Sequence, residues 1–125
     1  MGALEKLYQQ YKDRVQFVLV YIREAHPDSI LLIPKEGGGT ELGVVPQTET
    51  EDDRLKNLRL CASLLQFTMP SVIDTRDNIV NRAYAAWPDR LYAIGIDGKV
   101  AFKSGPGPSG FKSPDLAAWL QKNIP

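Results

Sequence analysis

Cysteine and histidine are almost absent from this sequence of 125 residues, which contains one of each, Cys61 and His26. A single cysteine excludes a disulfide within the chain. The two residues together are too few for an all-cysteine or cysteine–histidine zinc site. We therefore expect no metal site, and nothing else in the sequence predicts a cofactor.

An excess of either charge is also lacking, because 15 Lys and Arg residues balance 15 Asp and Glu residues. Net charge zero gives no reason to expect a nucleic acid or an anionic membrane surface as a partner. The longest apolar run, residues 15–22, is far shorter than the ~20 residues of a membrane-spanning helix. Residues 1–14 are too polar for a signal peptide. These observations predict a soluble, cytoplasmic protein.

The first half of the chain predicts a helix, a strand and a second helix. Residues 3–14 have apolar side chains at helical spacing, and residues 15–22 read as a strand covered on both faces. Thr50, followed by three acidic residues, predicts the start of a helix that ends before Pro70 and buries one apolar face. Between them, insertion 27–50 fits either a hairpin with a three-glycine tip or an irregular loop.

The second half predicts a strand, a helix, a hairpin and a last helix. The strand covers residues 70–74, and the helix covers 77–87 with Ile79 facing inward. Residues 91–96 and 99–103 flank Asp97-Gly98, which favours a tight hairpin turn. Residues 113–115 predict the start of the last helix, whose buried stripe is Leu116, Trp119 and Leu120.

This order of elements predicts a single α/β domain over residues 1–125. Helices and strands alternate before a terminal antiparallel hairpin, which points to a three-layer sandwich around a mixed sheet. Its outline is thioredoxin-like.

Four strings of residues, in this order and at these separations, resemble the iodothyronine deiodinase family, a branch of the thioredoxin-like, peroxiredoxin-related superfamily. They are YIREAH at 21–26, PSVIDTRDN at 70–78, AYAAWPDRLY at 83–92, and GPGP at 105–108 with Phe111. The resemblance implies a redox domain, with a thiol reductant and a small aromatic substrate as partners.

The sequence departs from that family at the nucleophile. The resemblance implies a first central strand leading to a selenocysteine or cysteine turn before the first helix, and this sequence contains neither. A second family histidine is also absent from residues 46–50. We therefore expect a deiodinase-related domain that is inactive as given. The alternative is a non-catalytic binding or assembly module with the same fold.

Glu24 and His26 are the candidate catalytic residues. They follow the strand at 15–22, and the carboxyl ends of parallel strands are where α/β folds place ligands. The resemblance implies that this pair lines the pocket and relays protons. The alternative is a capped strand end in which His26 bonds to the backbone.

Pro88 and Arg90 are the candidate substrate-binding residues. Pro88 stands where thioredoxin-like folds often carry a cis proline beside the active site. Arg90 suits an anionic group of the substrate, and the alternative is a surface salt bridge with Asp89 or Asp74. Cys61 lies in mid-helix, which predicts a small buried residue rather than a nucleophile.

The missing first strand has a physical consequence for assembly. Its absence leaves unpaired backbone groups beside the apolar strand at 15–22. The alternatives are that the chain is an N-terminally truncated fragment, that the flanking strands close up on each other, or that another chain supplies the edge. We therefore expect a homodimer or a larger assembly, joined through a sheet edge or the exposed site face.

Overall fold

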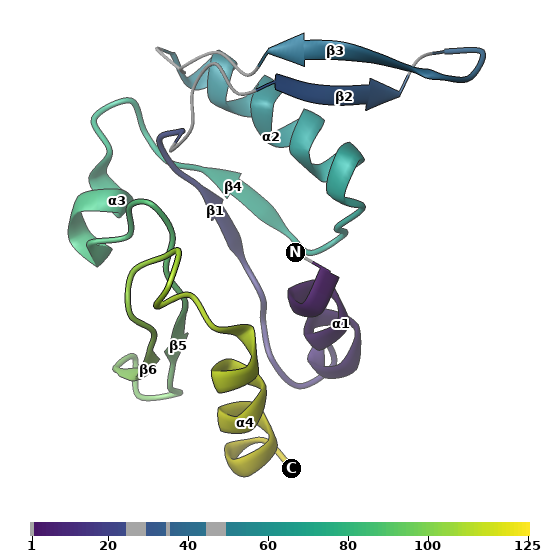
Figure 1. Ribbon diagram of the computed structural model, residues 1–125. Coiled ribbons are helices and arrows are strands. Elements are labelled where there is room, and N and C mark those ends of the chain that lie inside the picture. Colours follow the sequence, from purple (N-terminus) through teal and green to yellow (C-terminus); the bar gives the residue numbers. More distant parts are fainter. Residues whose placement is uncertain (1, 25–29, 35, 45–49) are drawn as a thin grey trace.

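Helices and strands alternate along the chain, as expected (Figure 1). The computed structural model describes residues 2–24, 30–34, 36–44 and 50–125. Its elements are α1 (Gly2–Tyr11), β1 (Leu19–Tyr21), β2 (Ile30–Pro34), β3 (Thr40–Val44), α2 (Glu51–Leu65), β4 (Ser71–Ile73), α3 (Ile79–Tyr84), β5 (Tyr92–Ile94), β6 (Val100–Lys103) and α4 (Ser113–Asn123). The mixed α/β content is confirmed, although most elements are shorter than their sequence patterns.

The described strands form three two-stranded sheets instead of the single mixed sheet expected. β1 pairs in parallel with β4, whereas β2–β3 and β5–β6 are antiparallel hairpins. β1 is bonded along one edge only, and no described strand joins it to β5. In a continuous sheet, neighbouring strands are hydrogen-bonded and lie about 4.8 Å apart. No described strand joins the β1–β4 pair to the β5–β6 pair in this way.

The prediction that the first strand is covered on both faces is wrong. Leu19 and Tyr21 pack against the core, but Val18 is 53% exposed and Val20 is 36% exposed. Alternate side chains of a strand point to opposite faces. The described elements cover the face of Leu19 and leave the face of Val20 and its partner Val72 open.

Both hairpins have glycine at the positions that their turns require. In insertion 27–50 the hairpin alternative is confirmed, with Gly37, Gly38 and Gly39 all at positive φ between β2 and β3. Residues 27–29, 35 and 45–49 of that insertion lie outside the described residues. The predicted turn at Asp97-Gly98 is also confirmed, with Gly98 at φ 79°.

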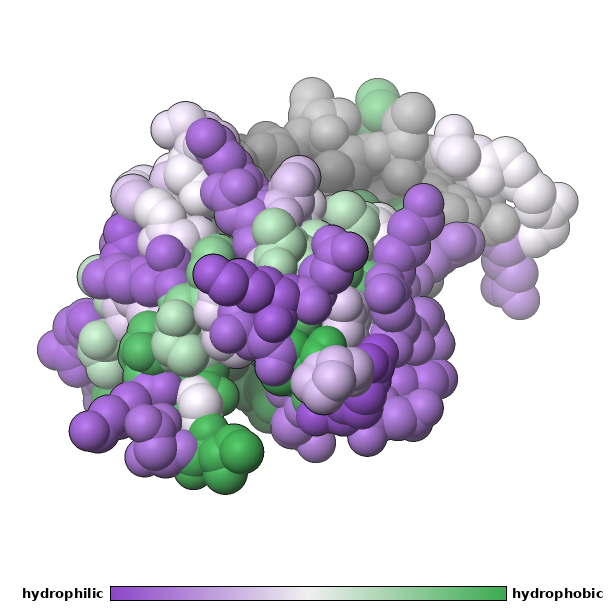
Figure 2. Space-filling model, turned by 90° about the horizontal axis from the view of Figure 1, so that it is seen from below, coloured by the Kyte–Doolittle hydropathy of each residue, from purple (hydrophilic) through white to green (hydrophobic). Residues whose placement is uncertain are grey.

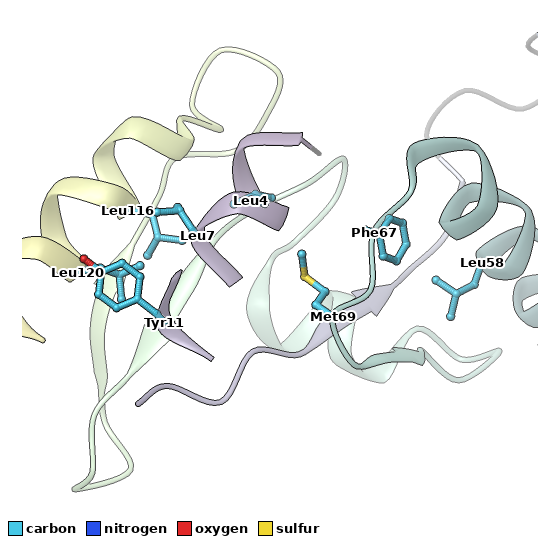
Figure 3. Close-up of a cluster of buried hydrophobic side chains, with 8 residues drawn as sticks. All are labelled: Leu4, Leu7, Tyr11, Leu58, Phe67, Met69, Leu116 and Leu120. Carbon is cyan, nitrogen blue, oxygen red and sulfur yellow. The ribbon is translucent and has the colours of Figure 1, made fainter. Parts of the chain in front are cut away.

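The hydrophobic core joins α1, α2 and α4 to the segment before β4 (Figure 3). Its eight buried residues are Leu4, Leu7, Tyr11, Leu58, Phe67, Met69, Leu116 and Leu120. Figure 3 shows Met69 lying between the α1–α4 group and the pair formed by Phe67 and Leu58. Seen from below, further hydrophobic surface shows between hydrophilic side chains (Figure 2).

Helix α2 begins where the sequence predicts. The Thr50 hydroxyl accepts from the Asp53 backbone N–H at 3.1 Å, and the Asp53 carboxylate accepts from the Thr50 N–H at 3.1 Å. This reciprocal pair satisfies two N–H groups that a helix start otherwise leaves unpaired. Helix α4 begins at Ser113, as the sequence predicts, but Lys112 occupies its capping position without a side-chain hydrogen bond.

Helix α3 is anchored by polar contacts. It covers Ile79–Tyr84 and has no buried residue, so the predicted inward position of Ile79 is wrong. Instead, the carboxylate of Asp74 accepts hydrogen bonds from the backbone N–H groups of Val80 at 3.0 Å and Asn81 at 2.9 Å. A carboxylate at a helix N-terminus satisfies free donors and complements the helix dipole.

Arg54 of α2 completes this buried network. Its side chain is 3% exposed, and Asp74 is 1% exposed. The guanidinium donates to the backbone oxygen of Thr75 at 2.7 Å and to Oδ1 of Asn78 at 2.5 Å. Burial raises the pKa of Asp74, but hydrogen bonds from backbone amides and the charge of Arg54 outweigh it and lower the pKa below its usual value. The network ties α2, the end of β4 and α3 together.

We expect Asp74→Asn to make the free energy of unfolding depend less on pH in the acid range. Because the pKa of Asp74 is lower in the folded chain, its stabilisation is present above the unfolded pKa of ~3.9 and is lost as pH falls through the folded pKa. The variant should lose about 1–3 kcal/mol at about pH 7 and change less than wild type from roughly pH 5 to pH 3. Urea unfolding followed by circular dichroism measures both. Asp13→Asn at an exposed position is the control, and parallel acid profiles for wild type and Asp74→Asn would contradict the assignment.

Candidate functional site

The carboxyl ends of β1 and β4 lie at the same end of their parallel sheet (Figure 1). Glu24 follows β1 and Asp74 follows β4, so the topology brings the two acidic residues to one edge. The Asp74 carboxylate already accepts hydrogen bonds from amides of α3 and interacts with the charge of Arg54. Glu24 is half-buried and remains the candidate for chemistry at this edge.

Tyr21 is the direct partner of Glu24. The phenol Oη donates a hydrogen bond to Oε2 of Glu24 at 2.5 Å. Tyr21 has the same strand orientation as Leu19, so its side chain points toward the core and α2. This hydrogen bond joins the tyrosine hydroxyl to the carboxylate that follows the strand.

Two residues of α2 complete this group, and we call Tyr21, Glu24, Asn57 and Cys61 the Tyr–Glu cluster. Asn57 is 7% exposed and is near enough to Tyr21 to influence the pKa of its phenol. Cys61 lies one helical turn further on the same face.

Burial and charge set the protonation states within the cluster. Burial raises the pKa of Tyr21, the hydrogen bond to the Glu24 carboxylate raises it further, and the hydrogen bond from Asn57 lowers it in part. Burial also raises the pKa of Cys61, with a smaller contribution from the negative charge of Glu24. Both the phenol and the thiol are therefore neutral near pH 7.

Cys61 is half-buried and packs against the hydrophobic core, as its mid-helix position predicts. A nucleophilic cysteine needs an exposed thiol with a lowered pKa. Cys61 has the opposite properties.

The segment that carries Pro88 and Arg90 approaches the end of β1 through Trp87. The guanidinium carbon of Arg23 lies 5.2 Å from the centre of the Trp87 ring, a cation–π contact. The Trp87–Pro88 peptide bond is cis. The Arg90 side chain is half-buried, and its Nε is buried without a hydrogen-bond partner.

The predicted site residues therefore have different outcomes. Glu24 lies in a polar cluster at the expected sheet edge, and Pro88 and Arg90 lie in the segment beside Trp87. Asp74, one of the two acids considered as an ion-pair partner of Arg90, bonds to other groups. His26 lies outside the described residues.

Sequence reasoning missed Tyr21 and Asn57. Tyr21 precedes Glu24 by three residues. It lies in a mostly apolar strand, so it was interpreted as an apolar residue and its hydroxyl was not considered. Asn57 is an amide on the helix face that also carries Leu58 and Cys61. A polar residue within a buried stripe is the signal that identifies it, because buried amides need partners.

Metal and membrane features are not found in the described part of the chain. There, no group of three or more histidine, cysteine, aspartate or glutamate side chains is placed to hold a metal ion. None of the helices described has the length and apolar character that crossing a membrane requires.

Known proteins match the chain along nearly its full length. The sequence model of the iodothyronine deiodinase family matches residues 1–124. Thyroxine 5-deiodinase of Aquarana catesbeiana is 37% identical over 126 residues, which cover 98% of this chain and 43% of that protein. The enzymes of the same name from Rattus norvegicus and Homo sapiens are 33% and 32% identical, each over 98% of this chain and 38% of their own length.

The chain thus spans about two-fifths of the length of these curated relatives. The family model covers residues 1–124, a range that includes the strand end carrying Tyr21 and Glu24. The chain belongs to the iodothyronine deiodinase family.

Proposed function

We propose that this chain forms the scaffold and proton-transfer part of a thioredoxin-like redox site that removes halogen from a small aromatic substrate. Membership of the deiodinase family supports the class of reaction. The single observation that carries the proposal is the Tyr21–Glu24 hydrogen bond at the carboxyl end of β1. The parallel β1–β4 pair, its crossover helix α2 and the β5–β6 hairpin support the thioredoxin-like part of the proposal.

The proposed reaction is a reduction by thiols. A thiolate or selenolate attacks the halogen, the carbon–halogen bond breaks, and the ring carbon takes up a proton. A second thiol then closes a disulfide or selenenyl sulfide and releases halide. In sum, an aryl halide and two thiol groups give the arene, the oxidised sulfur pair and hydrogen halide. The site must therefore deliver one proton to carbon.

Glu24 and His26 are the proposed proton-relay residues, with Tyr21 bonded to Glu24. A carboxylate with a phenol donor on one oxygen accepts and returns a proton without large rearrangement. Arg90, in the segment that approaches β1, is proposed to bind an anionic group of the substrate.

The attacking group in this proposal is not Cys61. The thiol is half-buried with a raised pKa, which disfavours the thiolate. We therefore propose that the nucleophile is supplied by a group outside these 125 residues, and that the chain alone does not catalyse the reaction.

Alkylation of Cys61 tests this exclusion. We expect iodoacetamide at about pH 8 to modify Cys61 at least roughly tenfold more slowly in the folded chain than in urea, because burial reduces both access and the thiolate fraction. Mass spectrometry of timed samples measures the rate. Equal or faster modification of the folded chain would contradict this exclusion and make Cys61 a candidate nucleophile.

Iodide release tests the proposed reaction in the whole protein that carries this chain. With an iodinated phenol carboxylate and dithiothreitol, Glu24→Gln should lower kcat by about 100-fold because a general acid–base group is lost. Arg90→Leu should raise KM by about tenfold because an ion pair is lost. Lys99→Gln on the exposed hairpin turn is the control. Ligand binding without iodide release would refute the redox proposal and establish the binding module instead.

The free edge of β1 is proposed to join two copies of the chain. Leu19 and Tyr21 bond to the β4 side, so the backbone groups of Val20 point to the free edge. Residues 15–22 carry no charge, so antiparallel copies bring no like charges together there.

Analytical ultracentrifugation at micromolar concentration should show a dimer or a larger assembly. Val20→Pro should yield monomers, because it removes the outward N–H and leaves the bonds to β4 in place. Val20→Ala keeps that N–H and is the matched control. A monomeric wild-type chain would contradict this assembly.

A further inference from the structure

The segment that carries Arg90 is bonded to the loop after β6 on both sides of that residue. The backbone N–H of Leu91 donates to the hydroxyl of Ser104 at 2.9 Å, and the Ser104 N–H donates to the backbone oxygen of Leu91 at 2.9 Å. The N–H of Gly107 donates to the backbone oxygen of Asp89 at 2.9 Å. Three hydrogen bonds therefore hold the residues immediately before and after Arg90.

Ser104 continues the β5–β6 hairpin in an altered form. Tyr92 pairs with Lys103 at the end of the antiparallel ladder, and the next step of the same register brings Leu91 and Ser104 together. Bonded pairs of such a ladder exchange two backbone N–H···O=C bonds. Here the serine hydroxyl accepts the second bond in place of a carbonyl, and it donates in turn to the backbone oxygen of Gly105 at 2.8 Å. Ser104 is 8% exposed, so the loss of its hydroxyl would leave a shielded amide without this acceptor.

Gly107 makes the contact on the other side of Arg90 possible. The register of the hairpin brings Pro106 opposite Asp89, and proline has no N–H to donate. The next residue, Gly107, supplies the N–H instead and passes close to the Asp89 side chain. A Cβ atom at position 107 would lie 1.5 Å from Oδ1 of Asp89 and 2.6 Å from its Cγ. A larger residue than glycine therefore displaces either this side chain or the loop.

The start of the same segment is anchored beside the candidate site. The Trp87 backbone N–H donates to Oδ1 of Asn81 in α3 at 3.0 Å, and the Trp87 ring contacts the guanidinium of Arg23. At the other end, Leu91 packs against the hydrophobic core. Arg90 thus lies in a short segment whose backbone is held at both ends.

We propose that Ser104 and Gly107 are positioning residues that fix the backbone around Arg90, so that its guanidinium is pre-positioned to bind the anionic group of the substrate. The inference rests on the substrate-binding role proposed for Arg90. A flexible cation loses conformational freedom when it binds an anion, and a backbone that is already fixed reduces this loss. The two residues therefore affect the affinity for a charged substrate and leave the chemical step unchanged.

Iodide release by the whole protein tests this role with a pair of substrates. One is an iodinated phenol with a carboxylate, and the other carries an uncharged amide in its place. Ser104→Ala should raise KM for the carboxylate about fivefold, and should leave kcat and both constants for the amide unchanged. Gly107→Ala should act in the same way, and adding Asp89→Ala should restore KM by removing the atoms that the new Cβ meets. Ser109→Ala, at an exposed position of the same loop, is the matched control.

A double-mutant cycle separates positioning from a general loss of structure. In the Arg90→Leu background, Ser104→Ala should raise KM no further, because the group that it positions is absent. An equal rise in KM for both substrates, or a further rise in the Arg90→Leu background, would show that Ser104 serves only the fold. Either result would overturn the proposal.

NMR of the 125-residue chain tests the positioning without any substrate. In Ser104→Ala, the Leu91 amide should exchange with water about tenfold faster, and nitrogen relaxation of the Arg90 Nε–H should show a more mobile guanidinium than in wild type or Ser109→Ala. If these changes occur while wild type releases no iodide, the proposed reaction is wrong and the positioning of Arg90 stands. Unchanged mobility of the Arg90 guanidinium would overturn the positioning role whatever the activity.

Discussion

The buried contact between Arg54 and the residues around Asp74 is the constraint on which the rest of the arrangement depends. A guanidinium and a carboxylate in the interior are tolerated only when their hydrogen bonds are satisfied. Here the backbone of the turn after β4 supplies acceptors for Arg54, and the first turn of α3 supplies donors for Asp74. The same few bonds set the position of α2 against β4 and the direction in which the chain leaves the sheet.

The position of α2 in turn decides the chemistry at the end of β1. Asn57 is three residues after Arg54, so both residues lie on the same buried face of α2. Structural and functional polar groups therefore share one helix face, where both are buried.

The features that the sequence predicts are those with local causes. The start of α2 at Thr50 and the turn at Gly98 depend on residues within a few positions, and both are confirmed. The open face of Val20 and the exposed Ile79 depend on what covers them, which periodicity does not reveal. Glu24 was found because strand ends are favoured sites, whereas Asn57 required knowledge of which residue it faces across the sheet. Long-range pairing thus accounts for most of the errors.

Helix α3, which has no buried side chain, is held to the rest of the fold mainly by polar contacts. Segments with little apolar contact open at a lower free energy than the core, and this helix is connected to the core through the amides bonded to Asp74. The chain that follows it carries Trp87, Pro88 and Arg90. Partial opening of α3 would therefore displace the segment that carries these three residues, while α1 and α4 remain packed.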